Sequence, residues 1–136
     1  MIKIINEIIE KLSASGLKEV YSAYDAVPVE RKSRSFFTII GLDSFESQQP
    51  VYSPETVFIP YKAEIFINVT APESYSMRKL YEYFSGNIKP VIMENTGIDF
   101  YIKKVSMKHD TQISRLVLTA KISVTGIENY ERNTET

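Results

Sequence analysis

Hydrophobic and polar residues alternate most regularly between residues 56 and 71, which read TVFIPYKAEIFINVTA. From Tyr61 to Thr70 the odd positions are all hydrophobic and the even positions are mostly polar. This period of two, in a segment rich in β-branched and aromatic residues, is typical of a half-buried β-strand. Pro72 cannot donate the next hydrogen bond of a strand ladder, so we expect the strand to end there. The length of the pattern predicts a strand that crosses the whole sheet.

The N-terminal segment shows the period of an α-helix instead. Residues 1–12 read MIKIINEIIEKL and carry hydrophobic residues at steps of three and four. Gly16 follows at the position where a left-handed cap would end such a helix. The predicted buried stripe is Ile2, Ile5, Ile9 and Leu12, with Ile4 and Ile8 beside it.

A second helix is predicted directly after the long strand, in PESYSMRKLYEYFSGNI. Ser74 or Ser76 is expected to be its N-cap, because a hydroxyl there can accept a hydrogen bond from a free backbone N–H. Gly86 and Pro90 predict its end. Its predicted buried stripe is Met77, Leu80, Tyr81, Phe84 and Ile88.

Four further segments alternate as strands do, at residues 18–25, 35–43, 98–108 and 114–126. The last two are joined by a polar turn and predict an antiparallel hairpin. The strand at 35–43 is hydrophobic on both faces, which indicates burial on two sides or a face covered by another subunit. Residues 44–55 show no period and hold two prolines, so we expect a long loop.

These elements predict one α+β domain over residues 1–126, with a mainly antiparallel four- to five-stranded sheet and two helices packed on one face. Residues 127–136 are too polar to bury and are expected to form a flexible tail. The sheet residues expected to be buried against the helices are Ile65, Ile67, Leu118 and Ile122.

Composition narrows the class of protein. The chain has 136 residues, which fits one domain with a single core. It contains no cysteine, which excludes a disulfide framework, a thiolate metal site and a cysteine nucleophile. Lysine and arginine number 16 against 17 acidic residues, so we expect no specific nucleic-acid binding. No run approaches the length of a membrane span, and no signal peptide is apparent, so we expect a soluble intracellular protein.

Candidate chemistry is sparse. His109 beside Asp110 is the sole histidine-based acid–base candidate, but neighbours in a hairpin turn seldom point at one substrate. Glu7 and Glu10 share a helical face without a third metal ligand, which is typical of a solvated surface. The glycines form no phosphate-binding cluster. We therefore expect no catalytic residue, no cofactor and no metal, and we hold an enzyme or a nucleic-acid-binding module as less favoured alternatives.

The order of predicted elements is helix, strand, strand, long proline-containing loop, long strand, helix and closing hairpin. The segments with the clearest patterns are the opening helix MIKIINEIIEKL, the strand FFTIIGLDSF, the strand IPYKAEIFINVTAP leading into the helix YSMRKLYEYF, and the final strand SRLVLTAKISV. This layout resembles the tail-terminator (tail-completion) proteins of long-tailed bacteriophages and related phage-like particles. The resemblance spans nearly the whole chain and transfers no functional residue one by one.

The resemblance implies a structural assembly protein and not an enzyme. Such a protein forms a hexameric ring that caps the tail tube, ends its polymerisation and joins it to the head-side connector protein. Its implied location is the cytoplasm of the bacterial host during assembly, and then the finished particle. Other small phage neck or head-tail joining proteins have a similar layout, so that alternative stays open.

A ring needs a heterologous interface, in which one surface of a protomer meets a different surface of the next. The surplus surface is expected on the two-faced strand, on the loop at residues 44–55 and on a basic turn, for which a solvated turn is the simpler interpretation. The candidate interface residues are Arg31, Lys32, Arg34, Phe36, Ile40, Leu42, Phe45 and Tyr52.

Overall fold

The computed structural model describes residues 2–17, 19–23, 36–94 and 99–132. Within them one six-stranded sheet runs in the order β1-β2-β4-β6-β5, with β3 paired to the far end of β4. Only β1 and β2 are parallel; the other pairs are antiparallel. The strands are β1 (Val20–Ser22), β2 (Phe37–Ser47), β3 (Val51–Tyr52), β4 (Thr56–Pro72), β5 (Asp99–Asp110) and β6 (Arg115–Glu131). The predicted α+β class with a mainly antiparallel sheet is confirmed.

The centre of the sheet is β4, as the alternating pattern predicts. It pairs with β2 on one side and along all of its 17 residues with β6 on the other. Its hydrophobic positions face the helices, and the expected core residues Ile65, Ile67, Leu118 and Ile122 are all buried. The strand ends at Pro72, as expected.

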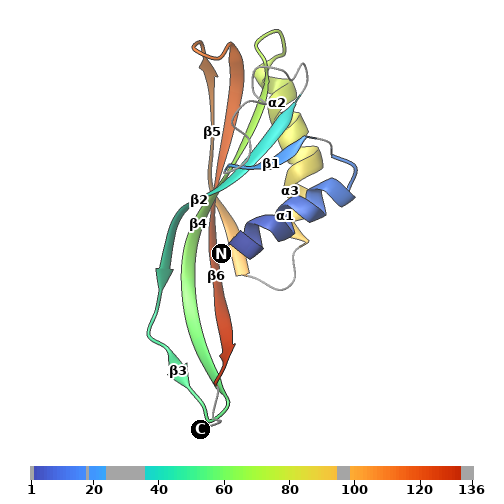
Figure 1. Ribbon diagram of the computed structural model, residues 1–136. Coiled ribbons are helices and arrows are strands. Elements are labelled where there is room, and N and C mark those ends of the chain that lie inside the picture. Colours follow the sequence, from blue (N-terminus) through green and yellow to red (C-terminus); the bar gives the residue numbers. More distant parts are fainter. Residues whose placement is uncertain (1, 18, 24–35, 95–98, 133–136) are drawn as a thin grey trace.

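The helices lie on one face of the sheet (Figure 1). Helix α1 (Ile2–Ala14) buries Ile5, Ile8 and Leu12 against it. Gly16 follows with a φ of 99°, and the Leu17 N–H donates to the Leu12 carbonyl at 3.3 Å. This is the left-handed cap that the sequence predicts.

The second helix begins as predicted and ends later. The Ser76 hydroxyl caps α2 (Met77–Tyr83) by accepting from the Lys79 N–H at 3.1 Å. The chain then continues through the π-helical turn η2 (Phe84–Ile88) into α3 (Lys89–Met93), so the end expected at Gly86 and Pro90 is wrong. The Lys89 N–H donates to the Phe84 carbonyl across the wide turn. Pro90 therefore falls in the first turn of α3, where its missing N–H breaks no hydrogen bond.

One position of the second helical stripe is also wrong. Leu80, Phe84 and Ile88 are buried as predicted, whereas Tyr81 is 44% exposed. The three buried positions are four residues apart and follow one line along the helix, and Tyr81 lies beside that line.

The two-faced strand β2 is buried on both sides within this chain. Ile40 faces the helices and pairs with Ile67 of β4. On the other face Phe37 and Ile39 form a second, smaller cluster with partly buried neighbours, among them Tyr21 and Phe66. Of the two alternatives for this strand, burial on two sides accounts for these residues.

Candidate assembly surface

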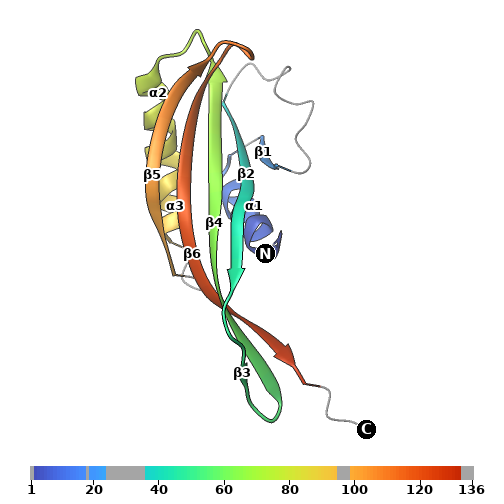
Figure 2. The same ribbon diagram turned by 90° about the vertical axis from the view of Figure 1, so that its left-hand side faces the viewer.

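Part of the sheet projects beyond the helices as a narrow ribbon (Figures 1 and 2). We call it the arm; it consists of β3, residues 56–60 of β4 and residues 126–131 of β6. The structure corrects two predictions here. The expected loop at 44–55 contains the end of β2 and all of β3, and the expected flexible tail supplies strand residues up to Glu131.

The physical reason is that strand pairing uses backbone groups. β4 presents a continuous row of N–H and C=O groups over 17 residues, so polar sequences can pair with it on either side. A bulge between Leu42 and Ser44 lets β2 stay in register with β4 as its sequence turns polar.

The tip of the arm is held by a dense set of hydrogen bonds. The Ser53 hydroxyl donates to the Thr56 carbonyl at 2.8 Å and accepts from the Thr56 N–H at 3.1 Å. The Arg132 N–H donates to the Glu55 carbonyl at 2.8 Å, and its guanidinium donates to the Ser53 carbonyl at 2.9 Å. The same guanidinium lies 5.6 Å from the centre of the Tyr52 ring. The tip therefore has a defined conformation without any partner.

Hydrophobic residues cover both faces of the arm. Val51 and Tyr52 are adjacent in β3 and so point to opposite faces. The stretch at residues 57–60 reads VFIP, a run of partly exposed hydrophobic residues in a ribbon that the described helices leave uncovered (Figure 1). The large residues that are at least half exposed on the arm are Val51, Tyr52, Ile127 and Tyr130. Such a run at a surface indicates a binding surface.

The arm is anchored where it leaves the sheet. The Tyr61 ring is buried there, stacks on Phe45 at 5.3 Å between centroids, and lies against Gly126. Burial raises the pKa of the Tyr61 hydroxyl above its usual value, and the carboxylates of Glu128 and Glu7 raise it further. Because Glu7 belongs to α1 and Glu128 to the arm, Tyr61 marks the junction between the helical layer and the arm.

The structure describes five of the eight predicted interface residues, and their exposure divides them into three groups. Phe45 lies near the arm and Tyr52 lies on it. Both are exposed, in agreement with their predicted surface position. Ile40 is completely buried and offers no surface to a partner, which corrects its prediction as an interface residue. The reason is its register opposite Ile67, which turns it towards the helices.

Phe36 and Leu42 are partly buried and pack against the core. Phe36 stacks on Tyr83 at 4.3 Å and meets the edge of Tyr75 at 5.1 Å, so a helix-side contact already occupies its ring. The basic turn with Arg31, Lys32 and Arg34 lies outside the described residues.

Sequence reasoning missed Val51, Ile127 and Tyr130 as surface residues of the arm. The available signal was the unbroken run VFIPY, because a strand covered on one face alternates and this one does not.

The predicted acid–base candidates His109 and Asp110 have separate partners. The His109 Nε2 lies 2.9 Å from a Glu73 carboxylate oxygen, and both side chains are about half exposed. Asp110 instead accepts from the Gln112 N–H, so the predicted neighbours do not act together. Within the described residues no three histidine or carboxylate side chains could share a metal ion, and no helix is long and apolar enough to cross a membrane.

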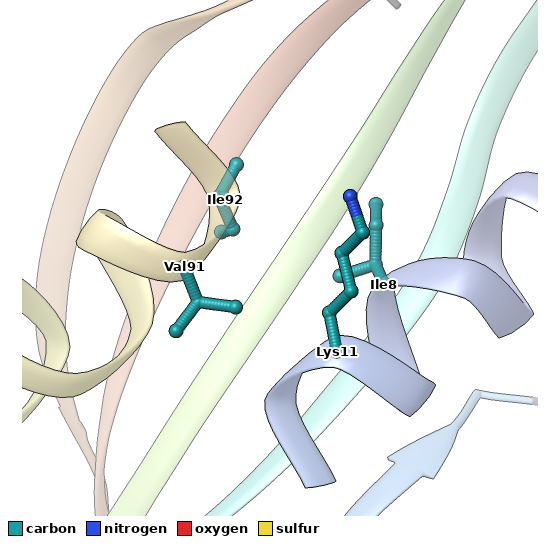
Figure 3. A pocket seen from close by; sticks show the side chains of 4 residues that line it. All are labelled: Ile8, Lys11, Val91 and Ile92. Atoms are coloured by element: carbon teal, nitrogen blue, oxygen red, sulfur yellow. The ribbon is translucent and has the colours of Figure 1, made fainter. Parts of the chain in front are cut away.

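A crevice lies between α1 and α3 (Figure 3). Ile8 and Lys11 of α1 and Val91 and Ile92 of α3 line it. Its volume of about 10 Å³ is close to the minimum for one water molecule, so it has no room for a substrate.

Comparison with known proteins leaves the function open. No protein-family model matches the chain, and no curated protein matches it. Among solved structures it is similar to the core region of PilO from the type IV pilus system of Pseudomonas aeruginosa, at 10% identity and a TM-score of 0.25, over 82% of this chain and 95% of that one. It is also similar to the type 4 fimbrial biogenesis protein PilO from Pseudomonas aeruginosa, at 9% identity and a TM-score of 0.26, over 96% of this chain and 67% of that one. TM-scores this low carry no argument about function.

Proposed function

We propose that this chain is a structural assembly protein of the tail-terminator type, which forms a ring, caps a phage tail tube, ends its polymerisation and joins it to the head-side connector. It would act in the cytoplasm of the bacterial host and remain in the particle. The observation that supports an assembly role is the arm, whose two hydrophobic faces are left uncovered by the rest of the described chain.

The arm suits a heterologous contact. Its tip is held by Ser53, Thr56 and Arg132 within one protomer, so little conformational freedom is lost when a neighbour covers it. A rigid ribbon with hydrophobic residues on both faces can be covered on two sides by a neighbouring protomer. One surface then meets a different surface on the next copy, which is the geometry of a ring.

The first experiment measures ring formation. Native mass spectrometry and electron microscopy of the purified chain, at rising concentration and on tail tubes of its own particle, should detect hexamers. The double variant Tyr52→Ser with Ile127→Ser should lose the ring and stay folded, because both side chains are largely exposed. Tyr81→Ser is the matched control, since it removes an exposed tyrosine from the helix side and should leave the ring intact.

The second experiment measures tube length. Tail-tube protein polymerised with the chain present should give tubes of limited length, and the double variant should fail to limit them. Monomers at every concentration and on tubes, together with unchanged tube length, would overturn the proposed function. Hexamers that persist in the double variant would overturn the role of the arm alone.

A further inference from the structure

The sheet face opposite the helices gathers five exposed lysines that are far apart in the sequence. Figure 2 looks onto this face. The lysines lie on the three adjacent strands β4, β6 and β5, and we call the set the lysine face: Lys62, Lys103, Lys104, Lys108 and Lys121. Their position follows from the register, in which the residues that alternate with them along β4 and β6 are the buried core residues.

Four carboxylates lie on this face and offset part of its charge: Glu46 and Glu64 beside the lysines, and Asp99 and Asp110 at the two ends of β5, opposite Thr125 and Arg115 of β6. Glu64 forms an ion pair with Lys103, and Glu46 lies directly opposite Lys62. The pKa of the Glu64 carboxyl is lowered, first by its hydrogen bond and charge contact with Lys103 and then by the charges of Lys121 and Lys62. An anionic group on this face is therefore stabilised by more than one lysine.

The positive charges of three of these lysines are not paired with a carboxylate of the described residues. Lys104, Lys108 and Lys121 form no ion pair within the part of the chain that the structure describes. Lys104 and Lys121 stand directly opposite each other on adjacent strands, where like charges repel. An anion bound between them would remove that repulsion.

The formal net charge of −1 does not reveal this local concentration of lysines. Six acidic residues lie on other surfaces, namely Glu10, Glu82 and Glu94 on or next to the helices and Glu55, Glu128 and Glu131 on or next to the arm. The cross-strand rows of Lys104 with Lys121 and of Lys108 with Val117, between Asp99 and Asp110, carry no carboxylate on β5 or β6. Such a distribution gives a local positive potential at the centre of this face, around Lys104, Lys108 and Lys121, in a protein with no net positive charge.

We propose that the lysine face binds the phosphate backbone of a nucleic acid without reading its bases. Along β5, Lys104 and Lys108 are separated by about 14 Å, and a duplex presents one negative charge per ~1.7 Å of axis, so several phosphates fall within that span. Lysine ammonium groups are point charges and lack the forked geometry that reads base edges.

Two other anionic partners fit the face less well. A membrane surface would be bound through hydrophobic anchors beside the cations, and the large exposed side chain of this face is a single tyrosine, Tyr101. An acidic protein surface would be discrete and matched in shape, whereas this face is a broad sheet surface with its charges spread over three strands. The proposal concerns a different surface from the arm and does not depend on the proposed function.

The experiment measures salt-dependent binding by fluorescence anisotropy, with a labelled duplex and a labelled single strand of random sequence. Three phosphate contacts should give a slope of about −3 for log K against log salt on the duplex, and Lys104→Gln with Lys121→Gln should reduce it to about −1. The matched control is Lys79→Gln with Lys89→Gln, which removes the same charge from the helix side and should leave the slope unchanged. Thermal unfolding of each variant verifies its fold.

Each other outcome overturns the proposal. Absence of binding at low salt would do so, as would binding that both double variants weaken equally. Tighter binding to anionic phospholipid vesicles than to either nucleic acid would assign the face to a membrane surface. Tighter binding to polyglutamate would assign it to an acidic protein.

Discussion

The anchor of the arm can be tested by adding one methyl group. In Gly126→Ala the new Cβ would lie 2.5 Å from the Tyr61 Oη and 2.7 Å from its Cζ, which is closer than van der Waals contact allows. The tyrosine ring cannot simply rotate away, because it is buried and stacked on Phe45. Overpacking of this kind costs about 1–3 kcal/mol, and loss of the aromatic stack falls within that range.

A second glycine provides the control for the same chemical change. A Cβ at Gly86 would meet nothing within 4 Å, and the residue lies in the helical turn η2. Gly86→Ala should therefore be neutral or stabilise the fold by up to about 1 kcal/mol, since alanine loses less backbone entropy in a helix.

The assay has two parts. Urea unfolding gives the free energy of unfolding of both variants, and hydrogen exchange reports the protection of individual amides. Gly126→Ala should lower the free energy of unfolding and speed exchange most strongly in the arm, at residues 56–60 and 126–131. If its unfolding free energy stays within about 0.5 kcal/mol of the unmodified chain, the close packing of Tyr61 on Gly126 is refuted.

Three further predictions follow from single contacts. Ile67→Ala should cost about 2–5 kcal/mol in urea unfolding, because the side chain is completely buried on the central strand; a loss below about 1 kcal/mol would contradict its core position. Ser76→Ala should cost about 1 kcal/mol in the same assay because the Lys79 N–H loses its acceptor, and an unchanged midpoint would argue against the cap. The Glu64 pKa is lowered in the folded state, so its stabilising contribution is present above the unfolded pKa and is lost as the pH falls through the folded pKa. In an NMR titration Lys103→Gln should return the Glu64 pKa towards its usual value, and an unmoved pKa would show that the ion pair is not its main cause.

The central core was predictable because one local signal determined it. The period of two in β4 and β6 identifies Ile65, Ile67, Leu118 and Ile122 as a single face, and no competing pattern exists in those segments. The cap at Gly16 was predictable for a similar reason, since a left-handed residue after a helix strongly favours glycine.

The continuation of the second helix was not predictable from propensity. Gly86 and Pro90 are both helix-breaking signals, so local propensity predicts an end there. The π-helical turn η2 adds a residue to the helical repeat, which moves Pro90 into the first turn of a new helical segment. A local backbone rearrangement of this kind has no sequence signature of its own, and it keeps Ile88 and Ile92 against the sheet.

The lysine face could be predicted in part, because hydrophobic periodicity locates the lysines of β4 and β6 but not those of β5. Lys62, Lys104 and Lys121 come from three strands that are separated in sequence by a helix and a turn. The alternation along β4 and β6 already places Lys62 and Lys121 on the face away from the core. The position of Lys104 opposite Lys121 follows only from the alignment of β5 with β6, which contains a bulge between Ile102 and Lys104, so local pattern alone could not have located it.

The arm is not predictable from local pattern because its segments are polar and contain prolines, which is typical of loops. Its stability as a ribbon has a specific explanation. A hairpin of two strands alone is marginal in water, but this ribbon continues two strands that pair in the core through Tyr61 and beyond. Its outer edge on β6 carries Glu128 and Glu131, and charges on an edge disfavour uncontrolled pairing with other strands. The β6 edge is thus protected against uncontrolled pairing while the hydrophobic faces remain open. A surface that resists edge pairing yet keeps Tyr52 and Ile127 exposed is suited to a partner that packs on its faces, which is the contact that the variants of those two residues test.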